Sequence, residues 1–432
     1  MNLLITVQSR RHLPYIATLI SEVEKNGGEV FFAIDSRRQS KEFASLRMHN
    51  SKLLVVPFSN RIMFYKNYRG CLQYLNSSCI EVTYFDRQRA RSNLRLSTNL
   101  LLMVLSRLPF SFRRLFVLKI MDILEHLIEK QIKASSIDDW LKKNKVTHLL
   151  VLGGNYHNSI EDTILFRCKR LNIKSFVYSH TLDNCNSKSA PSTDPDFYLV
   201  WNNHHLNTIV TLRNFPVEKI GIVGSGYHEN VIAHLRKSPK RESVELPGWK
   251  IRKDIDPYLL YLGSSINVHS DESSFLLNLI NNSSLPKGWK IKVRPHPANF
   301  QTWSLIADER FEICYQKEEF ENLDYSEFFN LADAAFGVFG INTSAFLDVV
   351  SMGIPVAAIT AITAAQKNVE LVRQRETSHF AFLEELGLPI FDNFAEILEF
   401  FSSGDSKLRL EWVSEVLPYL GNTSKEIYSK LK

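Results

Sequence analysis

Short apolar runs alternate along the chain with longer segments of mixed polarity. Residues 3–7 and 30–34 are apolar runs with β-strand character, and a helical segment over residues 14–25 separates them before Gly27 and Gly28. Apolar strands that alternate with helices belong to parallel sheets with both faces covered. The opening of the chain therefore predicts a doubly wound α/β domain.

The same alternation continues and then starts again after a break. The break is a charged stretch with proline and glycine at residues 236–256, which indicates a domain boundary. Before the break we expect strands at 148–152, 173–178, 197–201 and within 219–226, and a helix at 159–171. After it we expect strands at 258–262, 289–293, 334–338 and 355–359, and helices at 271–280, 326–333 and 344–351. The two series predict two Rossmann-like, doubly wound domains that face a ligand-binding cleft, over residues 1–225 and 226–407.

The composition limits what this protein can be. The chain has 432 residues, 44% of them hydrophobic, which excludes a disordered or low-complexity chain. Its net charge of +6 is too small to indicate a nucleic-acid partner, but it is compatible with anionic ligands or an anionic membrane surface. The five cysteines form no C-x-x-C pair and so indicate neither a disulfide framework nor a zinc site.

Two features of the sequence concern location. The first residues resemble a β-strand rather than a signal peptide, because no basic segment precedes the apolar run. The longest apolar runs, such as residues 100–105, fall far short of the roughly 18 residues that span a bilayer. We therefore expect a cytoplasmic protein of a reducing compartment.

One segment departs from the α/β pattern, because residues 87–121 contain no aspartate or glutamate. Between its apolar residues lie the basic residues Arg87, Arg89, Arg91, Arg95, Arg107, Arg113, Arg114 and Lys119. A basic and strongly apolar stretch of this kind can lie in the interface of an anionic membrane. Its apolar spacing equally fits a helix pair packed on the first sheet with its arginines in water. Peripheral membrane contact through residues 87–119 and simple packing are thus two alternatives.

The tetrapeptide Arg294-Pro295-His296-Pro297 stands at the end of a predicted strand. A residue before proline is held extended, so Arg294 and His296, two residues apart, point to the same side. Ligands of doubly wound sheets bind at the strand ends, where a guanidinium and an imidazole together suit a phosphate or a departing nucleotide. A stiffened strand exit with a solvated arginine is the simpler alternative.

Two further loops of the second domain can offer hydrogen-bond donors. In the segment after the predicted strand 334–338, Gly340 precedes Asn342, Thr343 and Ser344, any of which can cap the next helix. Free amides at such a helix start can bind an anion, although a bare helix cap explains the same pattern. The third loop, Gly263-Ser264-Ser265, offers amides and hydroxyls at another strand end, or is a plain turn.

The first domain is expected to present the acceptor and a base. Glu161 and Asp162 lie in the first turn of a predicted helix, where an acid can deprotonate an acceptor hydroxyl or simply complement the helix dipole. Weaker alternatives for the base are His12, His180 and Asp183. Asp194 and Asp196 have the spacing of a metal-binding pair but directly precede a strand, so we expect no metal and no cofactor.

The sequence also lacks the signatures of several common enzymes. It contains no phosphate-binding P-loop, no dinucleotide fingerprint at the first helix, no H-E-x-x-H and no G-x-S-x-G elbow. This absence argues against ATPases, dehydrogenases, zinc proteases and α/β-hydrolases.

With these motifs, the chain resembles the GT-B-fold glycosyltransferases of bacterial surface polysaccharide synthesis. The resemblance rests on the two Rossmann-like halves, on Arg294-Pro295-His296-Pro297 and on the later Asn342-Thr343-Ser344 followed by Gly353-Ile354-Pro355-Val356. The branch that it resembles most contains the sialyltransferases, Kdo-transferases and CDP-polyol phosphotransferases that carry a His-Pro motif. The resemblance implies that His296 and the Thr343-Ser344 loop bind the donor phosphate. It also implies that residues 408–432 cross back to the first domain.

The resulting hypothesis is a metal-independent glycosyltransferase with a nucleotide-sugar donor, CMP- or CDP-linked rather than UDP-linked. His296, Glu161 and Asp162 are its expected catalytic residues. The expected donor-binding residues are Arg294, Gly263, Ser264, Ser265, Gly340, Asn342, Thr343 and Ser344. The acceptor is expected to be a growing surface polysaccharide or lipid-linked glycan at the inner membrane face. A nucleotide-sugar epimerase or hydrolase, and a non-catalytic polysaccharide assembly protein, are the alternatives.

Overall fold

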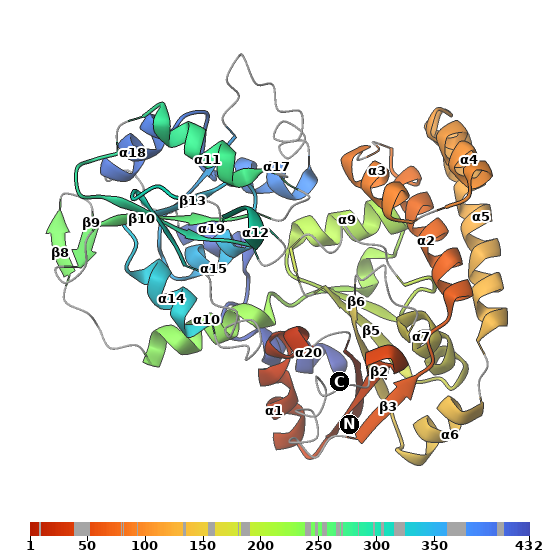
Figure 1. Cartoon of the computed structure of the whole chain (residues 1–432). Helices are drawn as coiled ribbons and strands as arrows, with labels where there is room; N and C mark the ends of the chain where they lie inside the picture. The colour runs from red at the N-terminus through yellow and green to blue at the C-terminus, as the bar shows by residue number, and fades with distance from the viewer. Residues whose placement is uncertain are drawn as a thin grey trace. The chain divides into compact units, whose positions relative to one another are not determined.

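The computed structural model describes most of the chain. The described residues are 1–7, 10–38, 52–78, 80, 82–92, 94–132, 135–153, 160–179, 181–182, 191–237, 243–246, 249–252, 257–264, 268, 271–283, 285–296, 299–303, 306–314, 325–360, 377–403 and 410–432. They form two compact units (Figure 1). Unit 1 comprises residues 1–229 and 415–432, and unit 2 comprises residues 230–414. The predicted boundaries follow residues 225 and 407, whereas these divisions follow residues 229 and 414.

Unit 1 is built on a seven-stranded parallel sheet in the order β3-β2-β1-β4-β5-β6-β7. Its strands are β1 (Asn2–Thr6), β2 (Glu29–Asp35), β3 (Lys52–Val56), β4 (His148–Gly153), β5 (Lys174–Ser179), β6 (Phe197–Val200) and β7 (Ile220–Ile222). After its first residue, each central strand is buried and mostly apolar, as expected when helices cover both faces of a sheet.

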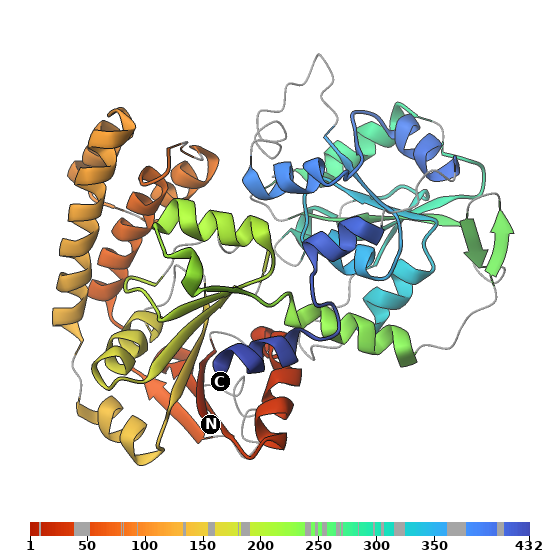
Figure 2. The same ribbon diagram turned by 180° about the vertical axis from the view of Figure 1, so that it is seen from behind.

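Helices lie on both faces of this first sheet (Figures 1 and 2). The helical elements of unit 1 are η1 (Arg10–Tyr15), α1 (Ala17–Lys25), η2 (Ser36–Arg38), α2 (Asn60–Leu75), α3 (Val82–Arg91), α4 (Leu96–Ser106), α5 (Phe110–Gln131), α6 (Ser135–Lys143), α7 (Ile160–Arg170), α9 (Asn203–Arg213), η4 (Val217–Lys219) and α20 (Thr423–Leu431). Helix α10 (Gly226–Lys237) begins in unit 1 and continues into unit 2. α6 and α7 contribute to the main core of the unit, and α2, α4 and α5 form a second apolar cluster beside it.

The last segment of the chain belongs to unit 1. Helix α20 packs against α1 near the N-terminus (Figure 2). The carboxylate of Glu229 accepts hydrogen bonds from the backbone and the hydroxyl of Ser424, with Glu229 Oε1 2.8 Å from Ser424 N. Residues 415–432 therefore complete a unit whose other residues precede the whole of unit 2.

Unit 2 contains a six-stranded parallel sheet in the order β12-β11-β10-β13-β14-β15, and a separate hairpin of β8 and β9. Its strands are β8 (Ser243–Leu246), β9 (Trp249–Arg252), β10 (Tyr258–Leu262), β11 (Lys290–Arg294), β12 (Phe311–Ile313), β13 (Gly337–Gly340), β14 (Val356–Ile359) and β15 (Ile390–Phe391). The strand order of the main sheet reverses between β10 and β13, which is where ligands bind in sheets of this kind.

The helices of unit 2 lie on both faces of its main sheet. They are α11 (Glu272–Asn281), α12 (Phe300–Trp303), α14 (Ser326–Asp333), α15 (Ala345–Ser351), α17 (Ser378–Glu385), α18 (Phe394–Ser402) and α19 (Leu410–Val416). α11 and α18 cover one face and supply apolar side chains to the core, while α14 and α15 cover the other (Figure 1). The prediction of two Rossmann-like, doubly wound α/β domains is confirmed.

One predicted strand is displaced along the chain. The apolar pattern predicts a strand at residues 334–338, whereas β13 covers Gly337–Gly340. Ala334 is still the C-cap of α14, because its amide donates to Asn330 O at 3.2 Å. Residues 334–336 therefore connect the helix to the strand, and Gly340 becomes the last residue of a strand instead of part of a loop.

The segment without acidic residues forms α4 and parts of α3 and α5. Both α4 and α5 bury one side, Leu102 and Leu105 in α4 and Val117 and Met121 in α5. Among the helices of the described ranges, none is both long and apolar enough to cross a bilayer.

Candidate functional site

The ends of three strands of unit 2 meet in register. Leu262, the last residue of β10, is paired with Arg294 of β11 on one side and with Gly340 of β13 on the other. The segments that follow these residues contain most of the expected donor-binding residues. The topology therefore gathers them at the carboxyl edge of the sheet, beside the reversal of strand order.

Arg294 is held at this edge by an aromatic ring. Its guanidinium carbon lies 4.1 Å from the centroid of the Phe328 ring, and Phe328 is buried on α14. A guanidinium stacked on an aromatic ring is stabilised by a cation–π interaction and loses mobility. The side chain is half-buried, so its position is fixed without full loss of solvent contact.

His296 is half-buried and does not belong to the apolar core. Its backbone carbonyl accepts a hydrogen bond from Asn299 N at 2.8 Å, which turns the chain after the Arg-Pro-His segment. The imidazole thus stands on a turn that follows the end of β11. The structure brings His296 and Arg294 to the same strand end.

Gly263 permits a close approach between two of the strand ends. A Cβ atom at this position would lie 2.9 Å from His296 N and 3.0 Å from Pro295 Cα, both of them backbone atoms. In addition, Gly263 N donates to Arg294 O at 2.9 Å. The main chain around Gly263 therefore packs directly on the Arg-Pro-His segment, and a larger residue would push the two apart.

The segment after β13 is tied to the segment after β10. Asn342 N donates to Ser264 Oγ at a distance of 3.4 Å. Ser344 occupies the N-cap position of α15, but its side chain makes no capping hydrogen bond, and Thr343 Oγ1 instead accepts from Ala345 N at 3.3 Å. Asn342 therefore lies beside Ser264 and Gly340 beside Leu262, while Thr343 and Ser344 follow at the start of α15. Ser265 falls outside the described residues.

Glu272, the first residue of α11, also contacts this edge, although no motif in the sequence indicates it. Both carboxylate oxygens of Glu272 accept from Ser264 N at 2.9 Å, and Oε1 also accepts from the Tyr261 hydroxyl at 2.7 Å. Asn299 Nδ2 donates to Oε2 at 3.4 Å. The side chain has no solvent exposure, and this burial raises the pKa of Glu272 to about 7.

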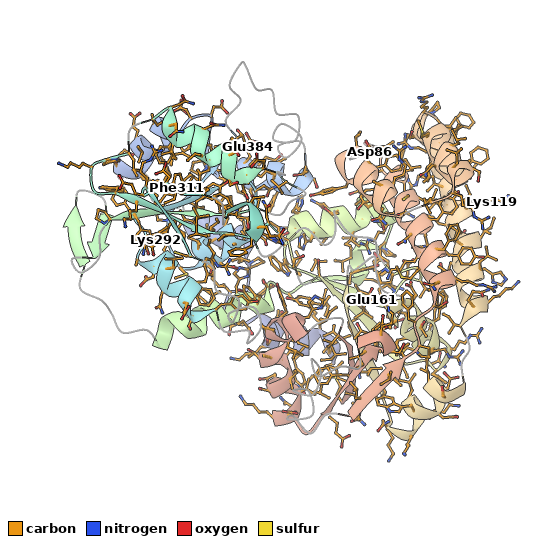
Figure 3. All side chains as sticks on the ribbon, viewed as in Figure 1. Asp86, Lys119, Glu161, Lys292, Phe311 and Glu384 are labelled. Carbon is orange, nitrogen blue, oxygen red and sulfur yellow. The ribbon has the colours of Figure 1, made fainter. Side chains whose placement is uncertain are left out.

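In unit 1, the predicted bases Glu161 and Asp162 are buried and face a lysine. Lys66 Nζ of α2 lies 3.2 Å from Glu161 Oε2 and 3.2 Å from Asp162 Oδ2, and the side chains show no exposure. Asp162 also accepts a hydrogen bond from Ser192 N. Burial alone lowers the pKa of Lys66, but Asp162 and Glu161 outweigh it and raise that pKa. Figure 3 labels Glu161 inside unit 1.

The weaker candidates for a base or a metal ligand fall elsewhere. His12 is half-buried, with its ring 6.4 Å from that of Tyr15, while His180 and Asp183 lie outside the described residues. Asp196 stands just before β6, and its carboxylate accepts from Ser175 N at 2.7 Å. Across the parts of the chain that the structure describes, no group of three or more His, Cys, Asp or Glu could hold a metal ion.

The chain is similar to known proteins in structure and not in sequence. No protein-family model and no curated protein sequence matches the chain. A UDP-GlcNAc 2-epimerase from Methanocaldococcus jannaschii matches over 100% of this chain and 99% of its own, with 14% identity and a TM-score of 0.56. The UDP-GlcNAc 2-epimerase from Neisseria meningitidis, bound to UDP-GlcNAc, covers the same shares with 12% identity and a TM-score of 0.53. A lipopolysaccharide outer core galactosyltransferase, WaaB, has 12% identity over 100% of both chains and a TM-score of 0.48.

At these identities the likeness concerns the fold. It extends over the whole chain, so it includes both sheets and the return of the last helix to unit 1. The protein has the GT-B fold.

Proposed function

We propose that the protein is a metal-independent glycosyltransferase that moves a sugar from a nucleotide donor to a glycan acceptor. The observation that carries this proposal is the set of neighbouring strand ends in unit 2, with Arg294 paired in register to Leu262 and Leu262 to Gly340. They form one edge that presents a guanidinium, an imidazole and hydroxyl groups. An edge of this chemistry suits a nucleotide phosphate.

Transfer of the sugar leaves negative charge on the nucleotide phosphate. In the proposed mechanism His296 and Arg294 stabilise this charge, together with the Asn342 to Ser344 segment. Stabilisation of developing charge by fixed groups is commonly the largest contribution to catalysis. The stacking of Arg294 on Phe328 supports this role, because a fixed cation needs no rearrangement during the reaction.

The general base is proposed to be Glu161 or Asp162, as the sequence suggests. Either carboxylate would have to leave its contact with Lys66 and gain access to the acceptor hydroxyl. Substitution of each acid separately by its amide, with turnover measured for both variants, identifies which of them acts.

The first experiment is a thermal-shift screen of the intact protein with CMP, CDP, UDP and GDP. A ligand that binds only the folded protein raises its melting temperature, and the resemblance to the His-Pro branch favours CMP or CDP. His296→Ala should then lower turnover by about 100-fold or more with the melting temperature unchanged. His126→Ala, an exposed histidine of α5, is the matched control. Near-normal turnover of the His296 variant would refute its role.

A nucleotide-sugar 2-epimerase is the second candidate, because the two epimerases above share the fold over the full length of the chain. Incubation with a nucleotide sugar alone separates the two proposals. Full turnover without an acceptor identifies an epimerase or hydrolase, whereas a transferase requires the acceptor. Failure to bind any of the four nucleotides would instead favour a non-catalytic assembly protein of polysaccharide export.

We further propose that the acceptor is a growing surface polysaccharide or a lipid-linked glycan, reached at the inner face of the membrane. The support comes from the α4–α5 apolar surface, defined by the exposed residues Leu96, Leu100, Leu101, Met103, Val104, Phe112, Leu115 and Phe116. Leu96, Phe112 and Leu115 are each more than 60% exposed. Two neighbouring helices with outward apolar residues are typical of a surface that contacts lipid or a partner.

The charge around this surface favours an anionic lipid. Arg95, Arg107 and Lys119 are exposed beside it, and Figure 3 labels Lys119 on the side of α5 that faces away from the sheet. By contrast, Arg113 of the same segment is buried, and its guanidinium binds the carbonyl of Leu75 at 2.8 Å. The proposed membrane contact within residues 87–119 therefore uses the outer arginines and Lys119, while Arg113 holds α5 on α2.

Vesicle sedimentation tests this contact. Phe112→Ser/Phe116→Ser should reduce binding to vesicles with anionic lipid by about tenfold or more, since each ring would otherwise be buried in the lipid. Val217→Ser/Tyr419→Ser, which changes exposed apolar residues elsewhere in unit 1, should not reduce it. If the protein ignores vesicles and forms a dimer that the phenylalanine variants break, the surface is a subunit contact instead.

A further inference from the structure

Glu272 is a fully buried carboxylate that neutral groups surround. Its partners are the Ser264 amide, the Tyr261 hydroxyl and the Asn299 amide, and within the described ranges the structure records no ion pair for it. Burial of a charge without an opposite charge is unfavourable, and hydrogen bonds offset only part of the cost. A glutamate at this position therefore does not favour the stability of the fold.

The contacts of Glu272 reach every strand end of the proposed donor site. Through Ser264 N it holds the residue that follows Gly263 at the end of β10. Ser264 Oγ in turn accepts from Asn342 N, after β13. Through Asn299 Nδ2 it holds a residue whose amide binds the carbonyl of His296, after β11.

These contacts change the role expected for the Gly263-Ser264 loop. The sequence suggests that the amides of this loop bind the donor, but Ser264 N points at Glu272, 2.9 Å from each carboxylate oxygen. The Ser264 hydroxyl is likewise engaged with Asn342. Ser264 thus connects Glu272 to the segment after β13, and its position follows that of the carboxylate.

We propose that Glu272 is a positioning residue of the donor site. Its side chain holds the segments after β10, β11 and β13 in one arrangement for the nucleotide phosphate. The inference rests on the proposed function, because that function assigns these segments to the donor. It adds a residue that does not touch the substrate and acts through Ser264 and Asn299.

Three variants separate this role from a purely structural one. Glu272→Gln keeps the shape but replaces one acceptor oxygen by a donor group. Ser264→Ala keeps the backbone contact with Glu272 and removes the hydroxyl that binds Asn342 N. Tyr261→Phe removes a 2.7 Å hydrogen bond to the same carboxylate from a side chain buried in the core, so it is the matched control.

Two measurements are made on each variant of the full chain. One is the dissociation constant, by calorimetry, for whichever of CMP, CDP, UDP and GDP the wild-type protein binds. The other is hydrogen exchange at the amides of Ser264 and Asn342. Glu272→Gln and Ser264→Ala should weaken nucleotide binding by about tenfold or more and speed exchange at Asn342, because buried donors lose their acceptors. Tyr261→Phe should lower the melting temperature and leave the dissociation constant within about twofold.

The outcomes distinguish the two proposals. If the wild-type protein binds none of the nucleotides, the proposed function fails, and exchange alone decides whether Glu272 holds the segments. Unchanged exchange at Asn342 in both Glu272→Gln and Ser264→Ala overturns the inference in either case. It is also overturned if exchange rises while nucleotide affinity stays at the wild-type value. Should Glu272→Gln fail to fold, Ser264→Ala carries the same test.

Discussion

Glu161 and Asp162 of unit 1 and Glu272 of unit 2 are all buried, but the groups around them differ in charge. In unit 1, Glu161 and Asp162 face Lys66 across 3.2 Å, so opposite charges compensate one another inside the protein. In unit 2, the donors that contact Glu272 among the described residues are uncharged, and burial raises its pKa to about 7. A buried ion pair stays charged over a wide pH range, whereas a lone buried carboxylate gains a proton near neutrality. The comparison predicts different responses to mutation and to pH.

The largest effect is expected where a compensating charge is removed. Lys66→Met leaves both carboxylates of unit 1 without their cation and should lower the free energy of unfolding by about 4 kcal/mol. Urea denaturation curves measure this loss. Lys130→Met, at an exposed position of α5, is the control and should change the free energy by less than about 0.5 kcal/mol. Equal stability of the two variants would show that the Lys66 ion pair contributes nothing.

The next effect concerns pH. The pKa of Glu272 rises on folding from 4.5 to about 7, so the folded state binds the proton more tightly. Its contribution to stability is complete below about pH 4.5 and is lost as the pH rises to about 7, a decrease of about 3 kcal/mol. Glu272→Gln should lack this decrease, and the difference between the two denaturation series isolates it. Parallel series would contradict the raised pKa.

Lys66 provides the contrast within the same experiment. Its pKa is raised from 10.5, so its contribution persists below that pH and is lost only as the pH rises further. Between pH 5 and pH 8 Lys66 should therefore give no pH dependence of its own.

A smaller effect is expected from the close backbone packing at the unit 2 site. Gly263→Ala places a Cβ within 3 Å of the backbone of His296 and should lower the free energy of unfolding by about 2 kcal/mol. Gly221→Ala, whose nearest neighbour is a leucine methyl at 3.3 Å, is the control in unit 1. If both substitutions cost the same, the approach at Gly263 is not tight.

The smallest effect is expected from the influence of Tyr261 on the pKa of Glu272. The Tyr261 hydroxyl lowers that pKa by donating to the carboxylate, in opposition to the larger effect of burial. Tyr261→Phe should therefore shift the upper end of the pH-dependent range to higher pH and cost about 1 kcal/mol of stability. A downward shift in the same denaturation series would show that the hydroxyl does not stabilise the ionised form.

The periodicity of the sequence predicts the strands better than it predicts the buried polar residues. Strands apolar on both faces, such as β10, stand out because their residues are uninterrupted. Glu272 looks like an ordinary acid in the first turn of a helix, where it complements the dipole. The signal that could have found it is its spacing, because Glu272, Leu276 and Ile280 recur on one buried side of α11. Lys66 repeats the pattern, four residues after the buried Ile62.

The parts of the site that the sequence does not predict depend on contacts between residues far apart in the chain. Residue order places Gly263, Arg294 and Gly340 at three separate strand ends, and only the strand order shows that the ends are neighbours. The hydrogen bond from Ser264 N to Glu272 joins residues eight positions apart, and the sequence does not indicate it. The side chains of the tetrapeptide around His296 indicate from the sequence that this segment suits a phosphate. The sequence does not indicate which group a backbone amide contacts.

The division of unit 1 between the two ends of the chain has a consequence for biosynthesis. Residues 1–229 leave the ribosome first. The contacts of α1 with α20 and of Glu229 with Ser424 can form only after all of unit 2 has been translated. The inserted unit can close its own sheet in the meantime. Until the last segment is made, α1 therefore lacks the helix that packs on it, and Glu229 lacks the hydrogen bonds that Ser424 donates.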